Sequence, residues 1–232
     1  MSDLLYRDYK INANFYDIFN KDRPYNIEMH YLLRILKHRR EVLDVGCGTG
    51  YHLSLLEDLG YLVEGIDINP KMIAVAKMRV KSPIYEANLL DFKLDSKYNA
   101  VIAMHHVFNH LKSYEEFEIG VKNLLEHTKK GGIVVIDLDN RRQTGIIEDK
   151  VDGNKRIIEC KYNKETEIEE RKITNYIGAR KFETIHEYLI YDPRKLEKIL
   201  DNMNVKYAML TNYLSQSFKI TDKILQIVIR KI

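Results

Sequence analysis

The sequence has no tryptophan, and its 232 residues include only two cysteines, four prolines and eleven glycines. The two cysteines, Cys47 and Cys160, are too few for the disulfide framework of a small secreted fold. No run approaches the roughly 18 apolar residues of a membrane-spanning helix. Charges at Asp3, Arg7 and Lys10 interrupt the N-terminal region, which therefore lacks the apolar core of a signal peptide. We expect a cytoplasmic protein without a membrane segment.

Neither sign of charge dominates, because the chain has 37 basic and 34 acidic residues and its net charge is only +3. The one compact basic cluster, 37–40, follows a predicted helix, where cations complement the helix dipole. This composition does not predict a nucleic-acid-binding surface. The length suits one α/β domain with an insertion. A homodimer remains open.

The most informative segment is EVLDVGCGTG at 41–50, in which an apolar strand runs directly into Gly46, Gly48 and Gly50. Glycine allows a tight turn and a close approach of the backbone to a ligand. A dinucleotide loop needs its third glycine at the sixth position, which here is Tyr51, and the Gly-Lys-Ser/Thr ending of a P-loop is missing. The spacing therefore favours a nucleoside ligand without a phosphate chain.

Strands and helices are expected to alternate through the first 140 residues. Strands are predicted at 41–46, 61–67, 83–87, 98–104 and 133–138, and helices at 26–36, 51–58, 70–79 and 113–127. Repeated β-α units of this length predict a parallel sheet with helices on both faces.

The pattern changes after residue 140. Three β-rich runs, 155–162, 166–177 and 182–191, follow one another without a helix and predict an antiparallel lid over the carboxyl edge of the sheet. A helix at 193–202 and strands at 205–210 and 223–231 then complete the chain, and the last two strands are expected to pair as a hairpin at the sheet edge.

The glycine segment resembles motif I of the class I S-adenosylmethionine-dependent methyltransferases, in which an acidic residue, here Asp44, precedes the glycines by two positions. The resemblance implies a Rossmann-like, doubly wound, seven-stranded α/β sheet with an antiparallel last strand. The expected organisation is a single domain over 1–232. Its parts are an N-terminal helical cap at 1–40, a cofactor-binding core at 41–140, the lid at 141–191 and a completing helix and hairpin at 192–232.

Asp67 stands 21 residues after Gly46, at the end of the second strand, where a carboxylate can accept both ribose hydroxyls. After the third strand, Asn88 occupies the position where the family usually has an acidic residue facing the adenine amine, and its carbonyl oxygen can still accept from that amine. Phe92 is predicted to belong to the core. The resemblance implies a cofactor-binding set of Tyr16, Tyr25, Asp44, Gly46, Cys47, Gly48, Gly50, Asp67, Ile68, Met72, Asn88, Leu89, Met104 and His105.

The loop after the fourth strand, 104–111, is rich in histidine. His105, His106 and His110, with Asp137 and Asp139, form one candidate metal set, but adjacent histidine side chains point in opposite directions, so no metal site is predicted.

The other interpretation of this loop makes one histidine a general base with a pKa near neutrality, or an orienting donor to the acceptor. His110 and Asn109 are the candidates, because FNHL resembles the corresponding segment of glycine and sugar N-methyltransferases. Tyr16 is added as a candidate catalytic residue beside the cofactor's positive centre.

The wider order of segments resembles the amino-sugar N-methyltransferases. It includes Phe15-Tyr16-Asp17, Lys21-Asp22, Tyr25, TGYHL at 49–53 and His186-Glu187-Tyr188. The resemblance implies methyl transfer from S-adenosylmethionine to a nitrogen or oxygen of a small-molecule acceptor. The alternatives are an RNA or protein methyltransferase and a non-catalytic cofactor-binding partner subunit. No Asn/Asp-Pro-Pro-aromatic motif of the base-amino methyltransferases follows the fourth strand.

Overall fold

A computed structural model describes residues 13, 16–21, 25–211, 213 and 216–232. Much of the expected N-terminal cap, including Phe15 and Asp22, lies outside the described residues. Within the described residues, no helix is both long enough and apolar enough to span a membrane.

The main sheet has eight strands in the order β11-β10-β12-β5-β4-β1-β2-β3. The strands β3, β2, β1, β4 and β5 pair with one another in parallel, and β12 runs antiparallel between β5 and β10. This arrangement confirms the predicted Rossmann-like sheet and its antiparallel last strand; a two-residue strand, β11, is the eighth. The bounds are β1 Glu41–Val45, β2 Leu62–Asp67, β3 Ile84–Glu86, β4 Tyr98–Ala103, β5 Thr128–Asp139, β10 Lys206–Thr211, β11 Gln216–Ser217 and β12 Ile224–Arg230.

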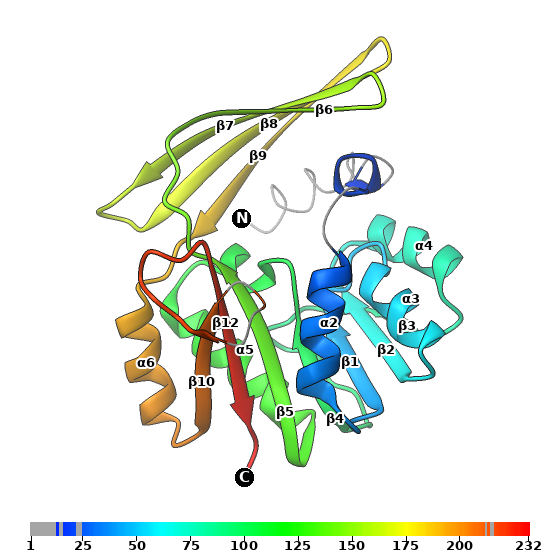
Figure 1. Ribbon diagram of the computed structural model, residues 1–232, viewed down its shortest axis with the longest axis vertical. Helices are drawn as coiled ribbons and strands as arrows, with labels where there is room; N and C mark the ends of the chain where they lie inside the picture. Colours follow the sequence, from blue (N-terminus) through cyan, green and yellow to red (C-terminus); the bar gives the residue numbers. More distant parts are fainter. Residues whose placement is uncertain (1–12, 14–15, 22–24, 212, 214–215) are drawn as a thin grey trace.

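Helices cover both faces of this sheet, and each face has its own apolar core (Figure 1). α2, α3 and α4 pack on one face, and α5 and α6 pack on the other. Three helices begin at side-chain caps, since Asn69, Ser113 and Asp192 each accept a backbone N–H of the first turn. The bounds are α2 Tyr25–Leu36, α3 Tyr51–Asp58, α4 Pro70–Arg79, α5 Tyr114–Glu126 and α6 Pro193–Asn202.

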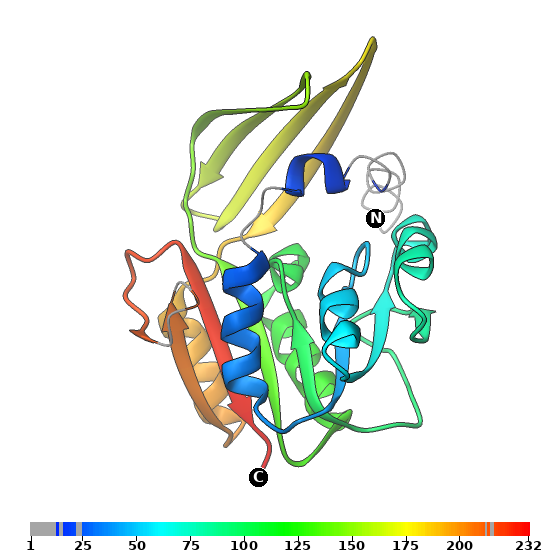
Figure 2. The same cartoon turned by 45° about the vertical axis from the view of Figure 1, so that its right-hand side comes forward.

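The inserted segment forms a separate antiparallel sheet above the carboxyl edge of the main sheet (Figures 1 and 2). Its four strands are β6 Gly145–Val151, β7 Asn154–Asn163, β8 Ile168–Ile177 and β9 Arg180–Leu189. Three of them correspond to predicted runs. β6 was not predicted, because its side chains are exposed or half-buried throughout, and such a strand carries little apolar alternation.

Candidate active site

The glycine loop joins β1 to α3 at the carboxyl edge of the sheet. Gly46 and Gly50 have φ angles of +72° and +77°, and a Cβ on Gly46 would lie 2.5 Å from Val107 Cγ2. Both positions therefore require glycine for backbone conformation, and Gly46 also for space. Gly48 differs, because no atom lies within 4 Å of the place a Cβ would take. The loop therefore leaves space for a ligand beside the Cα atom of Gly48.

Asp67, at the end of β2, is held against this loop by two backbone donors. Its Oδ2 accepts the N–H of Gly48 at 2.8 Å, and its Oδ1 accepts the N–H of Asn69 at 2.8 Å. Burial raises the pKa of Asp67, and these two hydrogen bonds oppose the rise. Each carboxylate oxygen keeps a further lone pair, so the group can also accept two adjacent hydroxyls. The neighbouring Ile68 is 50% exposed and offers an apolar surface at the same edge.

Asp44 lies on β1 beneath the loop and is 2% exposed. Burial raises the pKa of Asp44 to about 7; His52 opposes this rise, and Asp67 and Asp137 add to it. Its Oδ2 has no hydrogen-bond partner among the described residues. A positively charged ligand would stabilise a buried carboxylate that has an oxygen without a hydrogen-bond partner.

Four of the predicted cofactor residues have buried side chains. The side chains of Cys47, Leu89 and Met104 belong to the two apolar cores and are at most 8% exposed, and Met72 is 3% exposed. The side chains of Cys47, Leu89 and Met104 thus pack in the cores beside the site, and contact of these four residues with a cofactor remains a prediction. Phe92 is 3% exposed within the core, as predicted.

Two other predicted cofactor residues, Asn88 and Tyr25, contact neighbouring residues of the chain. Asn88 Oδ1 accepts the N–H of Leu90 at 3.0 Å, although a carbonyl oxygen retains a second lone pair. Tyr25 is 5% exposed and stacks on Tyr51 with ring centroids 3.8 Å apart. Contacts of Asn88 and Tyr25 with a cofactor remain predictions.

The loop after β4 contains two consecutive residues in the left-handed region. His105 and His106 have φ angles of +61° and +64°, a conformation that is unfavourable for residues other than glycine. The buried carboxylate of Asp137 holds this turn, because its Oδ1 accepts the N–H of His106 at 2.7 Å. Tyr213 donates its hydroxyl to the other oxygen at 2.6 Å. Asp137 thereby stabilises the conformation of the loop after β4.

Asn109, a predicted catalytic residue, is buried, and its side chain binds the backbone at the ends of two strands. It is 0% exposed, and its amide donates to the backbone oxygens of Asp139 and Leu189 at 3.1 and 2.7 Å. Its Oδ1 accepts the N–H of Asp139 at 2.8 Å. All three bonds tie the loop to the ends of β5 and β9.

A cavity of about 370 Å³ lies between the loop after β4 and the inserted sheet. Tyr16, Phe19 and Asn20 of the helical turn at 16–20, which lies beneath that sheet in Figure 2, also line it. The cavity contains three predicted residues, Tyr16, His105 and His110. Its other polar lining residues include Asn20, His106, Arg141, Gln143, Asp149, Arg156, Arg171, Asn175, His186 and Tyr188.

The guanidinium groups of the cavity are paired with carboxylates. Arg141 and Arg171 both donate to Asp139 Oδ2 at 2.7 Å, and Arg171 also donates to Glu169 Oε1 at 2.6 Å. The pKa of Asp139 is held well below its usual range: burial opposes the shift, but the Arg141 hydrogen bond and nearby positive charges outweigh it. Asp137 and Asp139 are therefore engaged in the protein's own contacts, and the structure does not bring the first candidate metal set together.

Residues 16–21 connect the glycine loop with the inserted sheet. Asp17 accepts the hydroxyl of Thr49 at 2.8 Å and the guanidinium of Arg79 at 2.6 Å. On the other side, the guanidinium of Arg156 lies over the ring of Phe19 at 4.9 Å. No sequence pattern singles out these contacts, because they join side chains more than 30 residues apart.

His110 borders the cavity, and its surroundings there disfavour the protonated ring. Burial lowers the pKa of His110 to about 3, and the neighbouring His186 and His106 act in the same direction. The ring is therefore neutral at physiological pH. A lowered pKa suits an orienting group better than a base with a near-neutral pKa, and the catalytic role of His110 remains a proposal.

This shifted pKa predicts a pH-dependent loss of stability. The unfolded state takes up a proton on His110 below its ordinary pKa of 6.5, whereas the folded state stays neutral down to about pH 3. His110→Gln should therefore reduce the loss of unfolding free energy between pH 7 and pH 5 by about 1–2 kcal/mol. Urea unfolding of both proteins at each pH measures it. The exposed His38→Gln is the control, and an equal loss in His110→Gln and the wild type would refute the shift.

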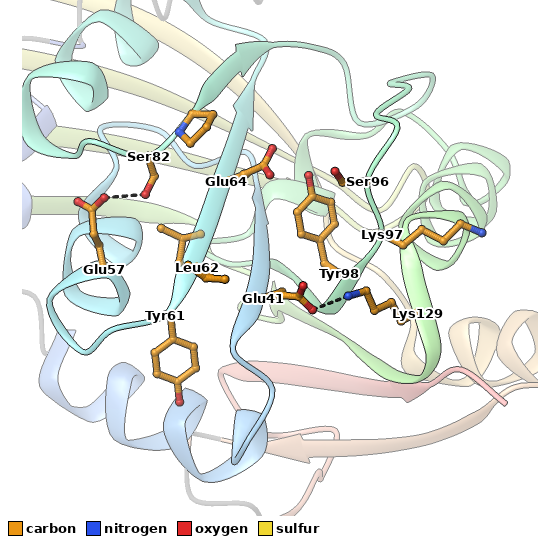
Figure 3. Close-up of a pocket in the computed structure, with 12 residues that line it drawn as sticks. Glu41, Glu57, Tyr61, Leu62, Glu64, Ser82, Ser96, Lys97, Tyr98 and Lys129 are labelled. Atoms are coloured by element: carbon orange, nitrogen blue, oxygen red, sulfur yellow. Dashed lines mark hydrogen bonds and ion pairs between the residues drawn. The ribbon is translucent and has the colours of Figure 1, made fainter.

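A second hollow, of about 670 Å³, is lined by residues that include Glu41, Tyr61 and Tyr98 (Figure 3). Its polar contacts include the Glu41–Lys129 ion pair and the hydrogen bond from Ser82 to Glu57. It lies near the amino ends of β1 and β2, whereas ligands of parallel sheets bind at the carboxyl ends. It is not the candidate site.

The chain is similar in sequence to known methyltransferases. Residues 43–136 match the family described as "Methyltransferase domain". A dTDP-3-amino-3,4,6-trideoxy-alpha-D-glucopyranose N,N-dimethyltransferase from Streptomyces venezuelae is 29% identical over 133 residues, covering 54% of this chain and 56% of the relative. The match thus spans just over half of that relative's length. A ubiquinone biosynthesis O-methyltransferase from Rickettsia canadensis is 28% identical over 227 residues, 86% of this chain and 92% of the relative.

Solved structures share the fold over nearly the whole chain. An S-adenosylmethionine-dependent methyltransferase from Clostridium acetobutylicum superposes with a TM-score of 0.83 at 15% identity, covering 96% of this chain and 98% of the other. DesVI from Streptomyces venezuelae superposes with a TM-score of 0.78 at 22% identity, covering 95% and 98%. At these identities the likeness shows the fold, including the inserted sheet.

Proposed function

We propose that this chain is a class I S-adenosylmethionine-dependent methyltransferase and that it transfers the methyl group of that cofactor to a nitrogen of a small molecule. The observation that carries the proposal is the pairing of Gly48 and Asp67 at the carboxyl edge. An open glycine lies beside a carboxylate that is already oriented by two backbone donors. The loop lacks the Gly-Lys-Ser/Thr ending of a P-loop and the third glycine of a dinucleotide loop.

The residues present fit the chemistry of S-adenosylmethionine. Asp67 supplies acceptors for the two ribose hydroxyls, and Ile68 supplies apolar surface beside them. The unpartnered oxygen of Asp44 suits a positive charge. When bound, the cofactor supplies an already activated methyl group on a sulfonium.

The chain's own residues then have to align the acceptor and exclude water, because such a displacement needs an in-line approach. Tyr16, His105 and His110 line the cavity beside the loop after β4. The inserted sheet covers that cavity, and residues 16–21 link it to the glycine loop. Together they hold the nucleophile in a site shielded from solvent.

The acceptor we propose is an amino sugar bearing an anionic group. The cavity of about 370 Å³ suits a small molecule better than RNA. Arg141 and Arg156 line it, and their side chains are 36% and 21% exposed, so each can still meet an anion. Relatives named as dTDP-amino-sugar N,N-dimethyltransferases support nitrogen as the target. The long match to the ubiquinone O-methyltransferase makes a hydroxyl acceptor the second candidate.

Methyl transfer from isotopically labelled S-adenosylmethionine to a panel of acceptors tests this proposal. The panel contains a dTDP-amino sugar, the same sugar without its nucleotide, a catechol and an unmodified tRNA, and mass spectrometry detects the product. Labelling of the dTDP-amino sugar supports the proposal. Labelling of the catechol alone or of the tRNA alone would contradict it. We expect the reaction to persist in EDTA, because no metal is predicted.

Asp67→Ala should weaken binding of S-adenosylhomocysteine by about 10- to 100-fold. The variant removes both ribose acceptors, and unpaired buried polar groups cost about 1–3 kcal/mol. Calorimetry measures the affinity, and thermal unfolding shows whether the loop is still folded. The exposed Asp58→Ala serves as the control. Undiminished affinity in folded Asp67→Ala would refute the ribose assignment.

A further inference from the structure

Glu28, on α2, is a buried carboxylate that no sequence pattern singles out. It is 1% exposed, and its Oε2 lies 2.8 Å from His105 Nε2 and 3.1 Å from His52 Nε2. The two imidazole rings pack edge to face with centroids 4.7 Å apart. Three elements thus meet at one oxygen: α2, the start of α3 and the loop after β4.

Two histidines and a carboxylate are also the ligand set of many metal sites, and their ligand atoms here lie within 4.8 Å of one another. Ligands placed about 2.0–2.1 Å from a tetrahedral zinc ion are separated from each other by about 3.3 Å. The observed separations of 2.8 and 3.1 Å are shorter and have the length of N–H···O hydrogen bonds. The geometry therefore favours a carboxylate that accepts one proton from each ring.

That arrangement determines which nitrogen of His105 carries the proton. A neutral imidazole has one N–H and one acceptor nitrogen. If Nε2 donates to Glu28, then Nδ1 is the acceptor, and it lies 3.4 Å from the hydroxyl of Tyr16. A tyrosine hydroxyl has a single proton, so a proton donated to His105 leaves the Tyr16 oxygen as an acceptor only.

We propose that Glu28 is a positioning residue that acts through His105 to direct the Tyr16 hydroxyl proton away from the acceptor, so that the Tyr16 oxygen accepts an N–H of the incoming amine. This inference rests on the proposed function. An amine that donates one N–H to Tyr16 is oriented by that bond. Glu28 itself lies behind His105 and does not reach the cavity, whose lining includes Tyr16 and His105.

The tautomers can be read directly, without any reaction. In protein labelled with ¹⁵N-histidine, we expect His105 and His52 to carry their protons on Nε2, with His52→Gln and His105→Gln supplying the assignments. Glu28→Gln retains a carbonyl oxygen and should keep both tautomers, whereas Glu28→Met removes the acceptor and should shift His105 toward the Nδ1–H form. A proton on Nδ1 of His105 in the wild type, or stoichiometric metal in the purified protein, would overturn the proposal.

The consequence for methyl transfer is tested by combining Glu28→Met with Tyr16→Phe. If Glu28 acts through Tyr16, each single variant should lower the single-turnover rate by about 10-fold, and the double variant should be no slower than Tyr16→Phe alone. Glu28→Gln should restore most of the rate, and the exposed Glu197→Gln on α6 is the control. Multiplicative effects, or no rescue by glutamine, would overturn the proposal. If no acceptor is ever methylated, the proposed function fails, while the tautomer measurement still decides the arrangement of Glu28.

Discussion

Asp44→Asn should stabilise the ligand-free protein above pH 7 by as much as about 4 kcal/mol. Burial raises the pKa of Asp44 from the ordinary 3.8 to about 7, so the folded state must lose a proton at greater cost than the unfolded state. This cost is absent below about pH 4, grows as the pH rises to about 7, and stays constant above that value. Asparagine has no proton to lose and removes the whole effect.

Chemical denaturation of the wild type and Asp44→Asn at pH 5 and pH 8 measures this difference. The gain in unfolding free energy should be larger at pH 8, and the exposed Asp58→Asn should show no such gain. The same variant should bind S-adenosylmethionine more weakly, because it lacks the negative charge that suits the cofactor. A variant that is equally stable as the wild type at pH 8 would show that Asp44 is not held at a raised pKa.

Asn109→Ala should lower the unfolding free energy by about 3–5 kcal/mol. Alanine leaves the backbone N–H and C=O of Asp139 and the C=O of Leu189 without their buried partner. Each unsatisfied buried group costs about 1–3 kcal/mol, and partial rearrangement reduces the total. The loop after β4 would lose these three hydrogen bonds to the ends of β5 and β9.

The matched control is Asn202→Ala, which changes an exposed asparagine at the end of α6. Urea unfolding gives the stability of both variants, and single-turnover rates at a temperature where both are folded give the chemistry. A stable Asn109→Ala protein with a strongly reduced rate would restore Asn109 to the catalytic residues. We expect the opposite result.

The parts of the fold that depend on local patterns could be predicted from the sequence. The helices at 51–58, 70–79 and 193–202 agree with the structure at both ends, because caps and apolar spacing act within a few residues. The glycine loop and Asp67 were also predictable, since a fixed spacing places both at adjacent strand ends. For these elements, residues that are close in the sequence are enough to determine the structure.

The parts that depend on long-range contacts could not be predicted. Asn109 looks like a polar loop residue until β9 is seen to end beside it, 80 positions later in the chain. The pKa of His110 depends on burial beneath the inserted sheet, which the residues around it do not reveal. Glu28 resembles an ordinary helical glutamate until His52 and His105 are brought to its side chain.

Calorimetry of the unmodified chain tests the central claim most directly. Titration with S-adenosylhomocysteine and, separately, with NAD compares a nucleoside ligand with a dinucleotide at the same glycine loop. The structure predicts one binding site per chain for S-adenosylhomocysteine and no comparable binding of NAD. Absence of S-adenosylhomocysteine binding, or equal affinity for NAD, would contradict the assignment of Gly48, Asp44 and Asp67 to the cofactor.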